Sequence, residues 1–272
     1  MGGRGSKSGS APGPSIGGAG GGLMPNNQSS QNSPNNVANQ PATPQNTPVT
    51  PGGVTALAQM SDDQLATLIN QSKRVQMPNH LSDVYMSRSV DQTQKFVYAA
   101  GLNEKPTVLD TADFNKYLSD NNIPRSQLLA RSTGGADFTV AGTQMRMTPQ
   151  QVSLQLKDSS LTYVGGKRGG QVHGAGTYFD QNGGRPTGYS SSNGVTIIAA
   201  LSKKARVIDE SRLMSQSQRW ARSHPRAAAA IGPYTRQNQS IYALAQGYNV
   251  IQFGSYHNVI ERSALVIRRQ DY

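Results

Sequence analysis

The sequence predicts an α+β fold in which helices come first and mixed or antiparallel sheets follow. Two observations lead to this expectation. Capped helical patterns dominate residues 61–123, whereas short apolar segments separated by loops dominate residues 124–272. Because regular crossover helices do not separate these segments, a doubly wound parallel sheet is not expected.

Residues 1–60 are expected to form a disordered tail. Up to Ser61 the only charged residues are Arg4 and Lys7, and most of the others are Gly, Pro, Asn, Gln, Ser and Thr. Such a composition cannot bury enough apolar surface to offset the entropy of ordering the chain. The remaining residues, roughly 210, suffice for one ordinary domain with an added helical region.

Helix start signals mark the middle of the chain. Ser61 followed by Gln64 forms a capping box, and Thr148 followed by a proline and Gln151 forms another start. Further starts are expected at Ser89, with Gly101 as the stop of that helix, and at Asp110. None of these helices carries a charged constellation typical of catalysis, so they are interpreted as scaffold.

Strand-like segments begin after residue 127. Short apolar runs predict strands over residues 128–133, 195–201, 205–208, 248–253 and 258–267. Helical patterns at residues 211–222 and 240–246 interrupt the series. This order of parts indicates a mixed sheet with helices packed beside it.

The glycine-rich stretch of residues 164–200 is the most informative part of the chain. Glycine at this density supplies no core, and a chain keeps it mainly where the backbone turns sharply or lies against a ligand. Within the stretch, Gly174-Ala175-Gly176-Thr177-Tyr178-Phe179 precedes the apolar run of residues 195–201. The segment is either backbone that lies against a ligand or, more simply, a glycine-rich hairpin loop with a structural tyrosine. Both interpretations stay open at this point.

This hexapeptide resembles the G-x-G-x-Y-F turn of ADP-ribosyltransferases, which folds around the nicotinamide end of NAD. Other parts resemble the same family in order and spacing. Arg131-Ser132-Thr133-Gly134 resembles its opening strand, which bears an Arg or His before a glycine turn. Tyr189 resembles its second aromatic residue, and residues 247–260 resemble its last strand pair. The resemblance covers residues 124–272 and implies sheets around an NAD cleft.

The resemblance also implies roles for these residues toward NAD as a substrate. Loss of nicotinamide leaves an oxocarbenium-like ribose, so a site must hold the pyrophosphate and stabilise positive charge. A guanidinium can donate two parallel hydrogen bonds to phosphate oxygens. The resemblance implies this role for Arg131, with Ser132 beside it. Backbone at Gly174 and Gly176 can approach the dinucleotide. Aromatic faces stack on nicotinamide, the role implied for residues of the two tyrosine motifs: Tyr178, Phe179 and Tyr189. Alternatively, Arg131 is a surface arginine and the tyrosines are core residues.

The catalytic carboxylate is where the sequence departs from the family. His257 occupies the usual position of the glutamate, and the nearest acid is Glu261, four residues further on. Alternation along a continuous strand would place both side chains on one face, so the two are the candidate catalytic residues. Glu261 could equally be a surface acid that pairs with a neighbouring arginine. In that case the domain would be an inactive transferase-like fold.

The net charge of +11 is concentrated in residues 203–226, where seven Lys and Arg side chains accompany two acids. A basic face of this kind can bind nucleic acid, acidic partners or nothing. Only Trp220 is aromatic there, which does not support base stacking. The chain has no cysteine and its four histidines lack zinc-motif spacing, so no metal site is expected. No apolar run reaches bilayer length, so no membrane partner is expected.

The glycine-rich amino terminus and Asn/Ser-rich tail make the chain resemble transferase-like proteins encoded in bacteriophage structural gene clusters. This resemblance implies a location in the virion or in the cytoplasm of the bacterial host. Two functions follow as expectations. One is a mono-ADP-ribosyltransferase that modifies a host macromolecule. The other is a catalytically inactive minor structural or assembly protein of the virion, whose partners are phage structural proteins.

Overall fold

The computed structural model describes residues 52–77, 88–140, 143–162, 174–186 and 194–271. These residues belong to one compact unit, Thr47–Tyr272. Residues 1–51, which form most of the expected tail, lie outside the described residues.

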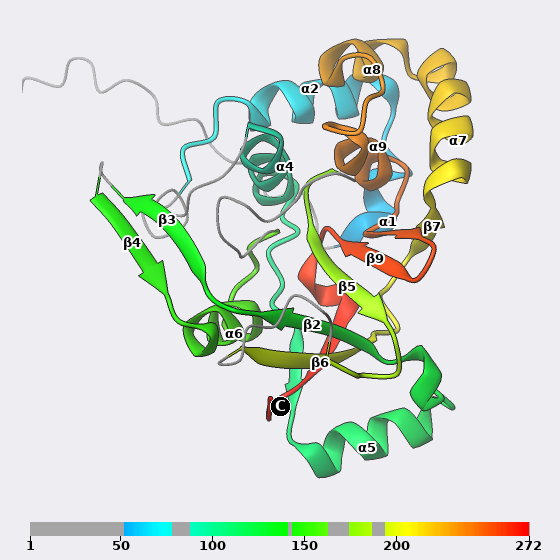
Figure 1. The fold of residues 1–272 in the computed structure, drawn as a ribbon. Coiled ribbons are helices and arrows are strands. Elements are labelled where there is room, and N and C mark those ends of the chain that lie inside the picture. Colours follow the sequence, from blue (N-terminus) through cyan, green and yellow to red (C-terminus); the bar gives the residue numbers. More distant parts are fainter. Residues whose placement is uncertain (1–51, 78–87, 141–142, 163–173, 187–193, 272) are drawn as a thin grey trace, which may run out of the picture. The chain divides into compact units, whose positions relative to one another are not determined.

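An eight-stranded mixed sheet forms the centre of this unit (Figure 1), with strand order β1-β10-β6-β2-β5-β9-β8-β7. The β1–β10 and β7–β8 pairs are parallel and the others are antiparallel. A separate hairpin joins β3 and β4. The expected mixed α+β class is confirmed. The strand bounds are β1 Thr107–Leu109, β2 Leu129–Thr133, β3 Ala136–Val140, β4 Thr143–Met147, β5 Thr177–Gln181, β6 Val195–Leu201, β7 Val207–Asp209, β8 Val250–Phe253, β9 Tyr256–Val259 and β10 Leu265–Arg268.

The helices begin at the expected caps in three cases. Ser61 and Thr148 each form a complete capping box, and the Asp110 side chain accepts from the Asp113 N–H. Ser89 is not a cap, because α4 already begins at Arg88. The helix bounds are α1 Gly53–Leu57, α2 Asp62–Ser72, α4 Arg88–Ala99, α5 Thr111–Asp120, α6 Pro149–Asp158, α7 Glu210–Ser223, α8 Pro225–Ile231 and α9 Gln239–Ala245, with 3-10 turns η1 at Arg125–Gln127 and η2 at Arg262–Ala264.

Different helices cover the two faces of the sheet. On one face α6 packs Val152 and Leu156 against strand residues such as Phe179 and Ile197. On the other face α5 packs Phe114 against Ala130 and the adjoining strands β6 and β10. The same second face carries a larger cluster over β7 and β8, which contains residues of α1, α2, α4, α7, α8 and α9. The middle strands β5 and β9 therefore lie between two helical coverings on that face, one that reaches β2 and one that begins at β8.

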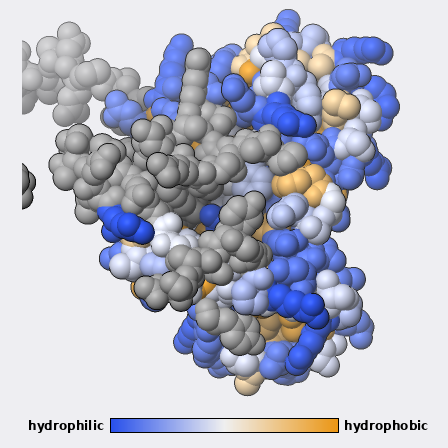
Figure 2. All heavy atoms as spheres, in the orientation of Figure 1, coloured by the Kyte–Doolittle hydropathy of each residue, from blue (hydrophilic) through white to orange (hydrophobic). Residues whose placement is uncertain are grey.

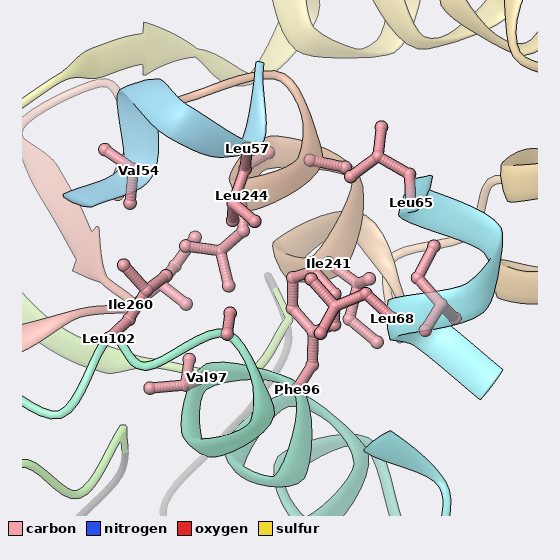
Figure 3. Close-up of a cluster of buried hydrophobic side chains, with 14 of the residues drawn as sticks. Val54, Leu57, Leu65, Leu68, Phe96, Val97, Leu102, Ile241, Leu244 and Ile260 are labelled. Atoms are coloured by element: carbon pink, nitrogen blue, oxygen red, sulfur yellow. The ribbon is translucent and has the colours of Figure 1, made fainter. Parts of the chain in front are cut away.

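The largest core cluster includes helix α1, which lies in the stretch expected to be tail (Figure 3). Val54 and Leu57 are 5% and 1% exposed, and both point toward a cluster that contains Leu244 and Phe96. The expectation of a tail reaching to residue 60 is wrong for residues 53–57. The reason is that two apolar residues three apart suffice to bury one turn of helix against an existing core.

The expected boundary between a helical region and a sheet domain at residues 123–124 is also not observed. Strand β1 precedes that point and pairs with β10, close to the end of the chain. Asp62 of α2 accepts the backbone N–H groups of Arg226 and Ala227 at the start of α8. Burial raises the pKa of Asp62, but these two hydrogen bonds outweigh it, so the pKa lies below its ordinary value.

The single strand expected over residues 258–267 is two strands. Val259 of β9 pairs with β5 and β8, whereas Leu265 of β10 pairs with β6. Between them in the sheet lie β5, β2 and β6, so the chain leaves one part of the sheet and enters another through η2. Strands β1, β3, β4 and β5 were not expected from the sequence.

Replacing Leu57 with alanine should lower the free energy of unfolding by about 2–4 kcal/mol, because the substitution leaves a cavity in the main core. Gln59→Ala, at an exposed position just after the same helix, is the matched control and should change stability by less than about 0.5 kcal/mol. Urea unfolding of the full chain measures both. Equal stability of the two variants would contradict the role given to α1.

Candidate functional site

Strands β2 and β5 separate after two residue pairs, and Arg131 lies where they part. The pairs are Leu129 with Gln181 and Ala130 with Asp180, after which β2 continues against β6 alone. The Arg131 Nη1 atom donates to the Tyr178 carbonyl oxygen at 3.0 Å. The structure therefore brings Arg131 to the predicted glycine–tyrosine segment.

The side chains of Arg131 and Tyr178 nevertheless start from opposite faces of the sheet. Arg131 is paired with Ile197, and Ile197 faces α6 together with Phe179. Tyr178 is paired with Asn258 on the other face. The guanidinium thus reaches the backbone of β5 at the seam between the two strands.

Three aromatic side chains form a cluster on the face that carries Tyr178. Its ring meets Phe253 edge to face, with centroids 5.8 Å apart, and Phe253 stacks on Tyr256 at 5.6 Å. The Tyr178 hydroxyl donates to the Gly174 carbonyl oxygen at 2.5 Å. Tyr256 is 39% exposed, so the cluster opens to solvent at that end. An exposed aromatic surface of this kind can stack on a planar cationic ring.

Ser132 and Phe179, both predicted to contact the cofactor, are core residues. The Ser132 hydroxyl lies 2.8 Å from the Thr196 hydroxyl across β2 and β6, and both residues are buried. Phe179 is 1% exposed and packs with the α6 face. Tyr189 lies outside the described residues.

The two glycines of the motif are explained by packing within the protein. A Cβ at Gly176 would lie 1.7 Å from the Asn258 side-chain oxygen. A Cβ at Gly174 would lie 2.9 Å from side-chain atoms of Gln239 and Ser240, and its φ of +84° also favours glycine. The Ser240 hydroxyl donates to the Ala175 carbonyl oxygen at 2.6 Å. The turn is therefore fitted against α9 and β9.

His257 faces away from the aromatic cluster. It pairs with Phe179 and Gln252, and it lines a cavity of about 360 Å³. Burial lowers the pKa of His257, although a backbone hydrogen bond with Ser255 and the charge of Asp180 oppose this effect. The imidazole is therefore neutral near pH 7. The cavity is lined by apolar and amide side chains as well: Ile123, Gln127, Leu129, Gln181, Leu201, Val207 and Gln252.

Glu261 lies beyond the end of β9, where it caps the turn η2. Its carboxylate accepts from the Ser263 N–H and hydroxyl at 2.8 and 2.6 Å, and from the Asn249 side-chain amide at 3.1 Å. Burial raises the pKa of Glu261, and these hydrogen bonds oppose the shift. The contacts of this carboxylate are with residues near β8, and they do not include Arg131 or Tyr178.

Arg262 is a residue of this region that the sequence did not indicate. It is fully buried, and its Nε and Nη2 atoms donate to the Leu161 carbonyl oxygen at 2.8 Å and to the Thr177 hydroxyl at 2.7 Å. Burial, assisted by the charge of Arg131 and opposed by that of Glu261, lowers the pKa of Arg262 to about 9. No sequence signal distinguishes it, because an arginine after a glutamate is typical of an exposed ion pair.

The basic residues 203–226 lie on an exposed part of the compact unit. Lys204 pairs with Glu104 and Arg226 with Asp63. Figure 2 shows a mostly hydrophilic surface in the region where Figure 1 places α7. Trp220 stacks on His224 with centroids 4.7 Å apart and meets Tyr242. The indole is therefore engaged within the protein, which gives no support to base stacking.

Among the described residues no helix is long and apolar enough to cross a bilayer. Within the same residues no group of three or more His, Cys, Asp or Glu side chains could hold a metal ion.

Comparison with known proteins gives no relative: no family model, curated protein or solved structure matches the chain.

Replacing Gly176 with alanine should destabilise the protein by about 2 kcal/mol or more, because the new methyl group overlaps Asn258 in a packed region. Gly254→Ala is the control, since its φ is +59° but no atom lies within 4 Å of the added Cβ. That variant should lose only about 1 kcal/mol from backbone strain. Thermal unfolding followed by circular dichroism compares the two. A Gly176→Ala protein as stable as Gly254→Ala would contradict the packing described here.

Proposed function

We propose that this chain is an ADP-ribosyltransferase-like protein that binds NAD where β2 and β5 part, and that it transfers ADP-ribose to a bacterial host macromolecule. The observation that carries the proposal is the hydrogen bond from Arg131 to the Tyr178 carbonyl. It joins two segments, 47 residues apart in the sequence, that both resemble the family. The proposal includes a phage origin, with the protein in the virion or the host cytoplasm.

The residues at the seam fit part of NAD. Arg131 is only partly buried and remains charged at neutral pH, so its guanidinium suits the pyrophosphate. The surface of Tyr178, Phe253 and Tyr256 suits the nicotinamide ring, but it lies on the face of the sheet opposite to the one from which the Arg131 side chain starts, which counts against a single cleft for both groups. NAD supplies the glycosidic bond that breaks, and the chain must orient the ribose and stabilise its positive charge. The glycine turn does not fit the role expected of it, because protein side chains already fill the space beside it.

A catalytically inactive structural or assembly protein of the virion is the second candidate, and two specific observations favour it. Glu261 is 3% exposed, and its carboxylate is held by Ser263 and Asn249. His257, the other candidate catalytic residue, lies on the face opposite the Tyr178 ring. Under this proposal the partners are phage structural proteins. The basic residues 203–226 remain available for nucleic acid under either candidate.

Arg131→Ala should weaken NAD binding by about 1.5–3 kcal/mol, the size expected when a charged hydrogen bond is lost. Isothermal titration calorimetry on the full chain measures this loss. The matched control is Arg125→Ala, which changes an exposed arginine of η1 and should leave the affinity unchanged. If the wild-type protein does not bind NAD at millimolar concentration, the transferase proposal is wrong.

Turnover separates the two candidate functions. If Glu261 stabilises the ribose cation, Glu261→Gln should abolish transfer from labelled NAD in host lysate while NAD affinity changes only a few-fold. The reason is that such a carboxylate acts mainly in the transition state. If the chain is an inactive module, wild-type protein labels no host fraction, and Glu261→Gln lowers only the melting temperature. The His257→Gln variant tests the other candidate residue in the same assay.

A further inference from the structure

Helix α7 presents three arginines on the side that faces away from the core. Arg212, Arg219 and Arg222 are exposed, whereas Leu213 and Ser217 are buried. With 3.6 residues per turn, successive side chains are rotated by about 100°, so the three arginines fall within an arc of about 80°. The two buried residues lie on the opposite side of the helix. The three arginines form what is called here the arginine stripe.

The arginine stripe has no acidic partner in the described part of the chain. None of its three guanidinium groups forms an ion pair there. Two other cations of the same basic stretch are paired with acids, Lys204 with Glu104 and Arg226 with Asp63. The stripe therefore offers its positive charge to a partner, whereas the charges of Lys204 and Arg226 are already engaged.

Two acids stand at the start of α7, and both are outside the stripe. Asp209 is the N-cap, and its carboxylate accepts from the backbone N–H groups of Ser211 and Arg212. Glu210 is the first residue of the helix and lies about 160° around the helix from Arg212. Negative charge thus opposes the stripe only near its first arginine.

The side chains beside the stripe are uncharged and polar. Ser211, Ser215, Gln218 and Ser223 are exposed on the same side of α7, so nothing there repels a phosphate. Met214 is 49% exposed, but it lies about 80° beyond the edge of the stripe. Protein–protein interfaces concentrate apolar and aromatic side chains at their centre, whereas interfaces with nucleic acid are more polar and more positively charged. The stripe has the second composition.

The stripe suits a duplex better than a single strand. Arg212 and Arg222 are ten residues apart, which is about 15 Å along a helix. A duplex presents about nine phosphates over that length, so three guanidinium groups can find phosphates without a fixed register. Binding of single strands relies on aromatic faces that stack on the bases. Trp220, the aromatic residue of α7, is engaged instead with His224 and Tyr242.

We propose that the arginine stripe of α7 binds the phosphate backbone of a nucleic-acid duplex without reading its base sequence. A guanidinium group suits this role, because it stays charged and can donate two parallel hydrogen bonds to phosphate oxygens. The affinity comes mainly from the release of counterions that are condensed on the duplex, so it falls as salt rises. The inference is independent of the proposed function, since the stripe is separate from Arg131 and Tyr178.

The competing explanation is that the stripe is an ordinary solvated surface, and that any binding reflects the net charge of +11. Two triple variants separate the explanations. The stripe variant replaces all three arginines of the stripe with glutamine, which has nearly the same helix propensity as arginine. The charge-matched control replaces Arg125, Arg185 and Arg269 with glutamine, three exposed arginines outside α7. Each variant removes three positive charges.

Fluorescence anisotropy of the full chain with labelled duplexes, over a range of salt concentrations, tests the proposal. Two DNA duplexes of unrelated sequence should bind equally, with a Kd between about 10⁻⁴ and 10⁻⁶ M at physiological salt. An RNA duplex is the second source of the same backbone, and the tighter ligand identifies the source. In the stripe variant the slope of log K against log salt should be shallower by about 2.7, or about 0.9 for each lost phosphate contact. The charge-matched control should keep the wild-type slope.

The single variant Arg219→Gln covers the case in which the stripe variant does not fold. It should weaken duplex binding about eightfold at about 0.1 M salt, the factor that corresponds to a slope change of about 0.9. The inference is overturned if wild type binds neither duplex, if the two DNA sequences differ in affinity, or if both triple variants lose affinity equally. It is also overturned if polyglutamate or single-stranded DNA binds as tightly as the duplex.

Discussion

The path by which the chain enters β5 is the constraint on which the candidate site depends. At Gly176 the backbone passes so close to β9 that a Cβ would lie 1.7 Å from the side-chain oxygen of Asn258. Thr177 and Tyr178 follow immediately and begin the ladder with β9. The hydroxyl that holds Arg262 and the carbonyl that holds Arg131 are therefore positioned by one close approach between two strands. A side chain at position 176 would displace both anchors together.

The position of β9 between β5 and β8 also explains why two neighbouring charged residues that follow β9 bond in opposite directions. Glu261 and Arg262 are neighbours in the chain, yet Glu261 bonds toward Asn249 beside β8 and Arg262 bonds toward Thr177 of β5. Burial raises the pKa of the acid and lowers that of the arginine, because each charge is removed from water. The hydrogen bonds of the acid are thereby directed away from the strand that holds the two guanidinium groups.

The sequence was informative where a local pattern determines structure and uninformative where tertiary contacts do. The seven residues of β6 match the expected strand at both ends, because an apolar run interrupted only by Thr196 is characteristic of a strand buried on both faces. Strand β5 was missed, since only one of its large apolar side chains, Phe179, is fully buried and glycines precede it. β9 and β10 were merged into one strand, because Ile260 and Leu265 continue the apolar pattern while η2 is specified by the Glu261 cap. The proximity of Arg131 to the Tyr178 segment followed from the family resemblance, whereas the burial of Arg262 required contacts with Leu161 and Thr177 that no local pattern contains.

The residues predicted for a single site are divided between the two faces of the sheet, and this division limits the chemistry. Tyr178 and Tyr256 offer an aromatic surface on one face, while His257 is on the other and neutral near pH 7. A ligand that stacks on the aromatic surface is separated from His257 by the sheet itself, so a neutral imidazole behind the sheet cannot stabilise its developing charge. Among the predicted residues that the structure describes, Arg131 and Tyr178 meet at the seam, where the guanidinium reaches β5 from the α6 face. Under the proposed function, ligand binding at the seam depends on Arg131, whereas catalysis on the aromatic face requires an acid from that same face. Asp180 has this placement, because it alternates with Phe179 and shares its face with Tyr178.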